Sequence, residues 1–451
     1  MNGVELMTRF HRFERELAVF DQLANGSPWW DSVRYDVYTF LGQVLLGRGS
    51  TVIPPPLWRR LAGDVKRSAA RWKLRFEVGQ DPGRILLIRA PRAWQDGRYV
   101  DNIVDPIGAL FPGRTSAINT LPRRYHVPVI QDSARSGSVP VDLDKTVAAL
   151  LDAFGIAQHQ ARALKKIIRL RRLVYEVELR GYERLFKRAR PELIVLVQNG
   201  IEKALFTTAH RYGIPTAEVQ HGLIGYLHGA YSYSPDIDYT AQSTFPDLFL
   251  TFSDHWKAAC HYPAASCVPI GNESYFVRPM AAKTPGATMV ISANIYHNTL
   301  AAWVRAISAL SPQRRILYKL HPNQSTSASQ IAEEFRHLTN VEVMESHVPA
   351  SMLLKDVSHI IVVCSTVAYE ALQAGRTVCI IPQHDYLSHR DIFHLPGVVV
   401  PATPEELDRA LDVENSTVEA PCFFDPFNAL LARSTIEDAI RQRRGYSERM
   451  T

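Results

Sequence analysis

Cysteine is scarce in this sequence and long apolar runs are absent, which removes several classes of protein. The 451 residues include 5 cysteines, and no two of them form a CxxC pair. An odd, scattered set argues against a disulfide framework or a zinc ribbon and favours a reducing cytoplasm. No uninterrupted apolar stretch reaches the roughly 18 residues that a membrane-spanning helix needs. Residues 1–15 are polar and charged, without the apolar core of a signal peptide.

Charge of one sign is hardly in excess: 51 Lys and Arg residues oppose 45 Asp and Glu residues, for a formal charge of +6. This surplus is compatible with anionic substrates or an anionic membrane surface and requires neither. No helix-turn-helix, zinc or RNP motif accompanies it, so nucleic acid is not an expected partner. The length indicates two domains, with roughly three of about 150 residues as an upper limit.

The order of apolar and helical segments predicts an α/β protein. Residues 1 to about 80 are expected to be mostly helical. In the first half, apolar runs predict strands at 84–88, 193–197, 216–220 and 247–252. In the second half, strands at 288–292, 315–319, 341–344, 359–363 and 377–381 alternate with helical stretches. Such alternation indicates parallel sheets. We expect a first domain at 1–277, a second at 288–425, and a helical tail at 426–451 that packs back onto the first.

A highly basic helix is predicted near residues 161–190. This segment holds eleven Lys and Arg against three Glu, a net of +8 by subtraction. Its apolar residues recur at helical spacing, which favours an amphipathic helix with a solvated cationic face. The alternative is a surface that attracts anionic lipid headgroups or a polyanionic acceptor.

Two polar motifs follow strands of the second predicted sheet. Lys319-Leu320-His321-Pro322 ends one strand, and Cys364-Ser365-Thr366 lies between another strand and a helical stretch. Ligands of open α/β sheets bind beyond the carboxyl ends of the strands, and free N–H groups at a helix start suit a phosphate. Each motif alone is more often a fixed loop or a helix cap. Together they predict a nucleotide site formed by Lys319, His321, Pro322, Ser365, Thr366 and Glu370. Glu370 either reaches a ribose hydroxyl or lies exposed on its helix.

A third motif, Glu218-Val219-Gln220-His221-Gly222, ends a strand of the first domain. A His-, Tyr- and Gly-rich loop follows it, as in many loops that contact sugars. We expect a catalytic role for His221, and sugar or acceptor contacts from Asn199, Glu218, Gln220, Gly222 and His228. The alternatives are a buried histidine in a tight turn, or metal ligation by the two histidines, for which no further ligand pattern is present.

An acidic loop offers candidates for a general base. Asp96 lies in Gln95-Asp96-Gly97, and Asp101 and Asp105 follow it, four residues apart. A carboxylate that faces the cleft can deprotonate an acceptor hydroxyl. Aspartates at the start of a helix are more often caps or partners of the helix dipole, so a structural role is the alternative for each.

These motifs resemble those of bacterial surface-polysaccharide glycosyltransferases of the GT-B type. His321-Pro322 and Ser365-Thr366 resemble the motifs with which sialyltransferases and Kdo- and capsule-forming transferases hold the cytidine monophosphate part of a CMP-sugar. Residues 193–222 are similar to a segment of capsular and lipopolysaccharide biosynthesis proteins and, more loosely, of polymerases that use CDP-glycerol. The resemblance covers about residues 80–395. Sialyltransferases carry an acid before the Asp-Gly of their catalytic motif, where this chain has Gln95, so the base stays open between Asp96, Asp101 and Asp105.

The resemblance implies two Rossmann-like, doubly wound domains that face a cleft, with helical N-terminal additions and a C-terminal crossing helix. It implies transfer of a sugar, with CMP-sugars favoured, to a lipid-linked or oligosaccharide acceptor in capsule or lipopolysaccharide biosynthesis. No metal and no cofactor are expected, because no DxD motif with a convincing context is present. The location expected is cytoplasmic, with the basic helix at the inner face of the membrane.

Three rival interpretations remain. A transferase of glycerol or ribitol phosphate from a CDP-polyol would use the same phosphate loops. A sugar-nucleotide epimerase has a similar two-domain shape, but the basic helix and the long N-terminal region have no role in it. A non-catalytic assembly module on a GT-B scaffold is supported by the replaced acid at Gln95.

Overall fold

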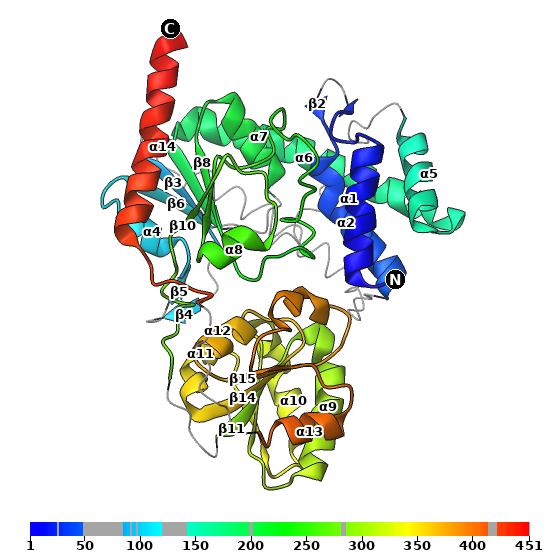
Figure 1. Ribbon diagram of the computed structural model, residues 1–451. Coiled ribbons are helices and arrows are strands. Elements are labelled where there is room, and N and C mark those ends of the chain that lie inside the picture. The colour runs from blue at the N-terminus through cyan, green and yellow to red at the C-terminus, as the bar shows by residue number, and fades with distance from the viewer. Residues whose placement is uncertain are drawn as a thin grey trace. The chain divides into compact units, whose positions relative to one another are not determined.

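The computed structural model describes residues 1–24, 27–47, 84–90, 93–95, 98–119, 142–197, 202–280, 286–413 and 422–450. The chain forms two compact units (Figure 1). The first comprises Met1–Thr251, Trp256–Ile270 and Asn428–Thr451, and the second Phe252–His255 and Gly271–Phe427. Residues 252–255 and 271–277, expected in the first domain, therefore belong to the second unit. There Phe252 stacks on Tyr275 at 4.8 Å between ring centroids, and Tyr275 stacks on Phe424 at 5.5 Å.

The first unit is built on a six-stranded parallel sheet with the order β10-β9-β8-β7-β3-β6. The strands are β3 (Ile85–Arg89), β6 (Thr115–Asn119), β7 (Leu193–Val197), β8 (Thr216–Val219), β9 (Leu248–Thr251) and β10 (Ser266–Pro269). Counted along the chain, this is the doubly wound order 2-1-3-4-5 with a sixth strand added. Its topological switch point lies between β3 and β7, where such sheets place a ligand beyond the carboxyl ends of the strands.

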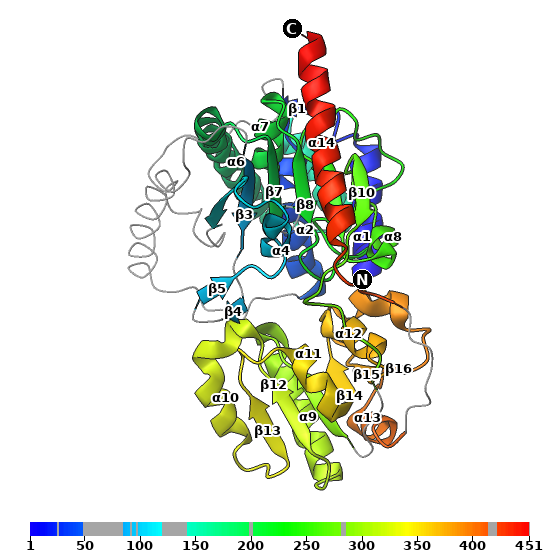
Figure 2. The same cartoon turned by 90° about the vertical axis from the view of Figure 1, so that its left-hand side faces the viewer.

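Helices cover this sheet and extend the unit at both ends of the chain. They are α1 (Gly3–Glu16), α2 (Asp31–Leu46), α4 (Asp105–Ala109), α5 (Leu143–Phe154), α6 (Ala161–Ala189), α7 (Lys203–Arg211), α8 (Asp254–Ala259) and α14 (Ala429–Met450). Two hairpins add β1 (Leu23–Ala24) with β2 (Ser27–Pro28), and β4 (Ala93–Gln95) with β5 (Arg98–Val100). The C-terminal helix α14 runs along this unit (Figure 2). It contacts α4, and Arg443 Nε donates to the carbonyl of Gly213 at 2.8 Å.

The second unit contains a six-stranded parallel sheet with the order β13-β12-β11-β14-β15-β16. The strands are β11 (Ala287–Ile291), β12 (Ile316–Lys319), β13 (Val341–Met344), β14 (Val357–Val362), β15 (Thr377–Ile380) and β16 (Val398–Val399). The segments between them form η4 (Asn294–Tyr296), α9 (His297–Leu310), η5 (Pro322–Ser327), α10 (Ala328–Phe335), α11 (Ala350–Leu353), η6 (Leu354–Asp356), α12 (Val367–Gln373) and η7 (Tyr386–Ile392), and α13 (Pro404–Ala410) follows β16. The chain-order pattern 3-2-1-4-5-6 is that of dinucleotide-binding sheets, with its switch point between β11 and β14.

Two parallel sheets with helices packed on them confirm the predicted α/β class. The predicted strands recur within two residues at either end, while the edge strands β6, β10 and β16 were not predicted. The core of the second unit is formed by apolar residues of β11, β12, β14 and β15 with α9 and α10, among them Val290, Ile316, Ile361 and Phe335. In the first, all five residues of β7 are buried.

The basic segment is one helix of 29 residues, α6, packed against α2, α5 and α7. Its buried face includes Leu164, Ile168, Leu173 and Phe186, while most of its Lys and Arg side chains are exposed. The amphipathic interpretation is therefore correct. Within the described residues, no helix has both the length and the apolar composition that a membrane span requires.

Candidate functional site

In the second unit, the strand order brings the predicted nucleotide motifs to one edge of the sheet. The strand β11 lies between β12 and β14, and all three are parallel. The loops that carry His321 and Ser365 therefore flank the loop after β11, which starts at Ser292. The loops after β11 and β14 border the switch point, which is where ligands bind in this topology.

A buried amide holds the His321 loop in place. Gln324 is 1% exposed, and its Oε1 accepts the backbone N–H of His321 at 2.9 Å. Its Nε2 donates to Ser292 Oγ at 3.0 Å, and that hydroxyl donates to Tyr318 Oη at 3.0 Å. Tyr318 Oη in turn lies 2.8 Å from Nδ1 of His297. This chain of hydrogen bonds ties the loop after β12 to β11 and α9, while the imidazole of His321 is exposed.

Lys319 has a different role from the one expected. Its side chain is 4% exposed, and its ammonium donates to the carbonyls of Leu320 and, at 3.3 Å, Ser346. Burial lowers the pKa of Lys319 to about 8. Because these carbonyls occupy two of the three donors of the ammonium, Lys319 joins the segments after β12 and β13 rather than serving as an open phosphate ligand. Pro322 begins η5, which follows at once.

The start of α12 is less open than predicted. The backbone N–H of Ser365 donates to Nε2 of His389 at 3.0 Å, and the N–H of Val367 donates to Ser365 Oγ at 3.2 Å. Two of the N–H groups expected to be free for a phosphate are therefore occupied within the protein. Phosphate contacts at this loop would have to come from Thr366 and from the Ser365 hydroxyl proton.

Glu370 is neither an exposed helix residue nor an ordinary carboxylate. It is 5% exposed, and burial raises its pKa to about 8, although a hydrogen bond with Thr366 lowers the pKa. The carboxyl group is therefore mostly protonated at neutral pH. Its hydrogen bond with the Thr366 side chain links Glu370 to the start of α12.

In the first unit, Glu218 and Gln220 are structural anchors at the end of β8. Glu218 is completely buried, and its two oxygens accept hydrogen bonds from Tyr231 Oη at 2.5 Å and Tyr262 Oη at 2.8 Å. Gln220 is also completely buried, and its Nε2 donates to the carbonyl of Gly222 at 2.8 Å. Neither side chain faces solvent, so both shape the loop rather than contact a sugar directly.

His221 is a partly exposed polar residue of this loop. Its ring stacks on Tyr231 with an interplanar angle of 15°, and Nδ1 lies 3.5 Å from Tyr231 Oη. His228 packs against the same group, 5.8 Å from His221 between ring centroids. Nδ1 of His228 accepts the N–H of Ala230 at 3.3 Å, and burial lowers the pKa of His228 to about 4. His228 is therefore neutral at physiological pH and packs against the other aromatic side chains of the loop.

The structure places two of the three acidic candidates in backbone-supporting roles. Asp101 is 1% exposed and accepts the N–H groups of Ala90 at 2.7 Å and of Ile103 and Val104 at 3.0 Å. Because these bonds use both oxygens, Asp101 is not a suitable base. Asp105 begins α4 and forms a two-pronged ion pair with Arg89, at 2.5 and 2.6 Å. Asp96 and Asn199 lie outside the described residues.

Sequence reasoning missed the buried ionic group beneath the loop. Arg34 of α2 pairs with Glu14 of α1 (Nε–Oε1 2.6 Å, Nη2–Oε2 3.0 Å), and both are at most 1% exposed. The same guanidinium donates to the carbonyls of Gly229 at 2.6 Å and Ser232 at 2.7 Å. The two N-terminal helices thus fix the backbone on either side of Tyr231.

The other residues that sequence reasoning missed differ in whether the local sequence pattern marked them as part of the site. Gln324 and Ser292 stand next to predicted strand ends, so their positions carried a signal. His389 lies 24 residues after Ser365, and nothing in the local pattern marked it.

Comparison with solved structures gives backbone likenesses at low identity. A UDP-GlcNAc 2-epimerase of Methanocaldococcus jannaschii, in complex with UDP-GlcNAc and UDP, is 10% identical, with 79% of this chain and 99% of that chain covered and a TM-score of 0.46. The glycosyltransferase VinC, in complex with dTDP, is 16% identical, with 80% and 99% covered and a TM-score of 0.45. The calicheamicin glycosyltransferase CalG4 is 14% identical, with 80% and 93% covered and a TM-score of 0.45.

No protein-family model matches the sequence, and no curated protein sequence matches it. What the chain does has to be inferred from its own strand orders and side chains.

Proposed function

We propose that this protein is a glycosyltransferase that moves a sugar from a nucleotide-activated donor, with CMP-sugars such as those of Kdo or sialic acid favoured. The acceptor is a lipid-linked or free oligosaccharide of capsule or lipopolysaccharide biosynthesis. One observation carries the proposal: the order 3-2-1-4-5-6 in the second unit gathers the His321 and Ser365-Thr366 loops at the carboxyl edge, beside the switch point.

The nucleotide is assigned to the second unit. His321 has an exposed imidazole on a loop that Gln324 fixes to β11, so the ring can donate a hydrogen bond to a phosphate oxygen without reordering the loop. The hydroxyls of Ser365 and Thr366 supply further donors from the neighbouring loop. Stabilising the leaving phosphate with positioned donors lowers the barrier to departure of the nucleotide.

The acceptor and the general base are assigned to the first unit, with His221 as the base. Tyr231 uses its hydroxyl proton in the 2.5 Å bond to Glu218. Its oxygen can therefore only accept from His221 Nδ1–H, which leaves Nε2 of His221 unprotonated. An unprotonated imidazole nitrogen on a partly exposed residue is suited to take the proton of an acceptor hydroxyl.

The first test measures nucleotide binding and turnover. Thermal unfolding with CMP, CDP, UMP, UDP and GDP should show stabilisation by a cytidine nucleotide, about 2.7 kcal/mol at a hundredfold excess over Kd. CMP release from CMP-Kdo or CMP-sialic acid should then require an acceptor and persist in EDTA. Release from CDP-glycerol instead would identify polyol-phosphate transfer. No stabilisation by any nucleotide and no release would end the transferase proposal.

The second test locates the base. His221→Gln should lower kcat by about 10²- to 10⁴-fold while the Kd for the nucleotide stays unchanged. Tyr231→Phe removes the acceptor for Nδ1–H and should lower kcat less, by about tenfold, with KM unchanged. If Asp96→Asn abolished turnover and His221→Gln did not, the base would be Asp96.

A further inference from the structure

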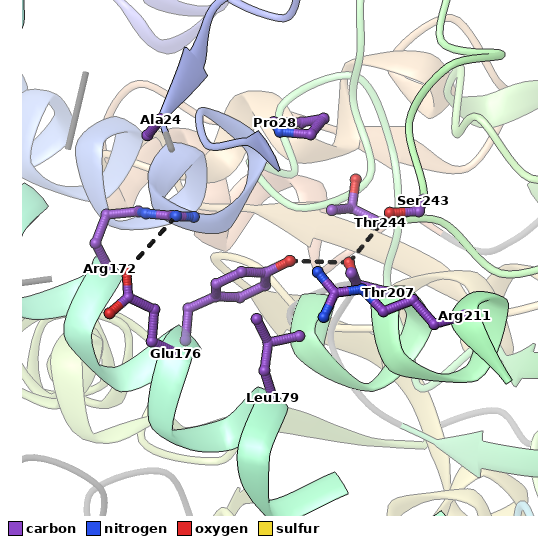
Figure 3. A pocket seen from close by; sticks show the side chains of 10 residues that line it. Ala24, Pro28, Arg172, Glu176, Leu179, Thr207, Arg211, Ser243 and Thr244 are labelled. Atoms are coloured by element: carbon purple, nitrogen blue, oxygen red, sulfur yellow. Dashed lines mark hydrogen bonds and ion pairs between the residues drawn. The ribbon is translucent and has the colours of Figure 1, made fainter. Parts of the chain in front are cut away.

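A cavity lies in the first unit, away from the edge of the sheet that carries His221. It has a volume of about 130 Å³ and is enclosed by α6, α7, the β1–β2 hairpin and the segment before β9 (Figure 3). Helix α7 leads from the carboxyl end of β7 back to the start of β8, so Thr207 and Arg211 in its second half lie toward the amino ends of the strands. Ser243 and Thr244 shortly precede the first residue of β9. The cavity therefore lies on the amino-terminal side of this sheet.

Two guanidinium groups line the cavity. Arg172 is 2% exposed; its Nη1 donates to Ser32 Oγ at 3.0 Å, and its Nη2 is 3.9 Å from Glu176 Oε1. Burial lowers the pKa of Arg172, while the neighbouring Tyr175 and Glu176 raise it. Arg211 is exposed at the mouth, and no carboxylate in the described part of the chain forms an ion pair with it. With Glu176, the lining keeps one net positive charge.

Hydroxyl groups face the same space, and one of them lacks a partner. Tyr175 Oη donates to Thr207 Oγ1 at 2.9 Å, and Ser243 Oγ donates to the same atom at 3.4 Å. Thr244 is 2% exposed, and its hydroxyl has no hydrogen-bond partner among the described residues. Buried polar groups in proteins nearly always find a partner, so an orphaned hydroxyl beside a polar cavity points to a missing ligand atom.

We propose that this cavity binds a phosphate-bearing ligand, with the phosphoryl oxygens between Arg172 and Arg211 and with Thr244 donating to one of them. Guanidinium groups bind phosphate through paired charge-assisted hydrogen bonds, and hydroxyls complete such sites. The volume equals that of roughly four water molecules, which suits a phosphoryl group and a few further atoms. The ligand is a phosphorylated small molecule or a lipid phosphate headgroup that approaches along the exposed cationic face of α6.

Calorimetric titration of the full-length protein with inorganic phosphate at fixed ionic strength tests the site. Arg211→Gln should raise the Kd by about tenfold or more, because a charge-assisted pair is lost. Thr244→Val should raise it by about two- to tenfold while leaving the melting temperature unchanged or higher, because its hydroxyl has no partner in the described part of the chain. Arg180→Gln, at an exposed position on α6 outside the cavity, should leave the Kd unchanged.

The proposal is overturned if phosphate binding does not saturate, or if Arg211→Gln and Thr244→Val bind as the wild type does. It is equally overturned if Arg180→Gln weakens binding as much as Arg211→Gln, because surface charge alone would then account for it. Binding to vesicles of phosphatidylcholine, with and without phosphatidic acid, distinguishes a lipid phosphate headgroup from a phosphorylated small molecule as the ligand. Binding to phosphatidic acid that inorganic phosphate displaces identifies a lipid headgroup, whereas saturable phosphate binding without vesicle binding identifies a soluble ligand.

Discussion

The backbone N–H of Ser365 donates to Nε2 of His389 at 3.0 Å, and the imidazole of His389 is completely buried. Because Nε2 accepts this bond, the ring proton is on Nδ1, which has no partner in the described residues. Burial lowers the pKa of His389 to about 4, so the ring stays neutral at physiological pH. The neutral, buried His389 therefore fixes the backbone of the loop that is predicted to bind the nucleotide.

This histidine should make the protein more stable as pH rises from about 4 to 6.5. In that window the unfolded chain binds a proton at this residue and the folded chain does not, so stability increases with pH. The full shift is worth about 3 kcal/mol. Urea unfolding at several pH values should show a shallower slope for His389→Gln than for the wild type. The pKa values of other histidines are shifted in the same direction and contribute to the slope that remains; they are His11, His228, His261 and His359. His347→Gln, an exposed control, should keep the wild-type slope.

Glu370 should have the opposite dependence on pH. Its folded pKa of about 8 is above the ordinary value of 4.5, so the folded chain retains a proton that the unfolded chain loses. Stability therefore falls as pH rises from about 4.5 to 8. Glu370→Gln removes this loss and should stabilise the protein at pH 7 by up to about 3 kcal/mol. The gain should vanish near pH 4, and Glu16→Gln, at an exposed position, should show none. A destabilised Glu370→Gln variant at pH 7 would mean that the carboxylate is the native form.

The strands that were predicted from the sequence and those that were missed differ in burial. Central strands of a parallel sheet are covered on both faces and appear as continuous apolar runs, such as Leu193–Val197 in β7. The three strands of the two six-stranded sheets that were missed, β6, β10 and β16, are all edge strands. In β10 and β16, no residue is fully buried. Edge positions are formed by short, polar or Pro-containing segments, whose patterns do not differ from those of loops.

The candidate site was predictable where it depended on strand ends and unpredictable where it depended on tertiary packing. His321, Ser365 and His221 follow predicted strands, and the topology brings the first two to one edge. The roles of Asp101 and Lys319 could not be predicted, because whether a charged side chain meets a ligand or a backbone group depends on residues distant in sequence. The Arg34 pair illustrates this, since its partners Gly229 and Ser232 lie almost 200 residues away.

Gly271 should be among the least replaceable residues. Its φ is +73°, and a Cβ atom there would lie 2.1 Å from the carbonyl oxygen of Pro426. Gly271→Ala should cost more than about 2 kcal/mol of unfolding free energy, from the left-handed backbone and the overlap together. Gly181, in the middle of α6 with open space around it, provides a matched control. Gly181→Ala should gain about 0.5–1 kcal/mol, and equal effects of the two substitutions in denaturant would contradict the contact.

The buried ion pair of Arg34 and Glu14 should contribute far more to stability than the exposed ion pair of Arg15 and Asp236, which also involves α1. Removing one partner leaves an uncompensated buried charge, so Arg34→Met or Glu14→Gln should each cost about 3–5 kcal/mol. The double variant should cost clearly less than the sum, because neither charge is then left alone. Arg15 and Asp236 also join α1 to the loop after β8, but both are about half exposed, so Arg15→Ala should cost less than about 1 kcal/mol. Urea unfolding of all four variants tests this, and additive losses for the buried pair would show that the two charges act independently.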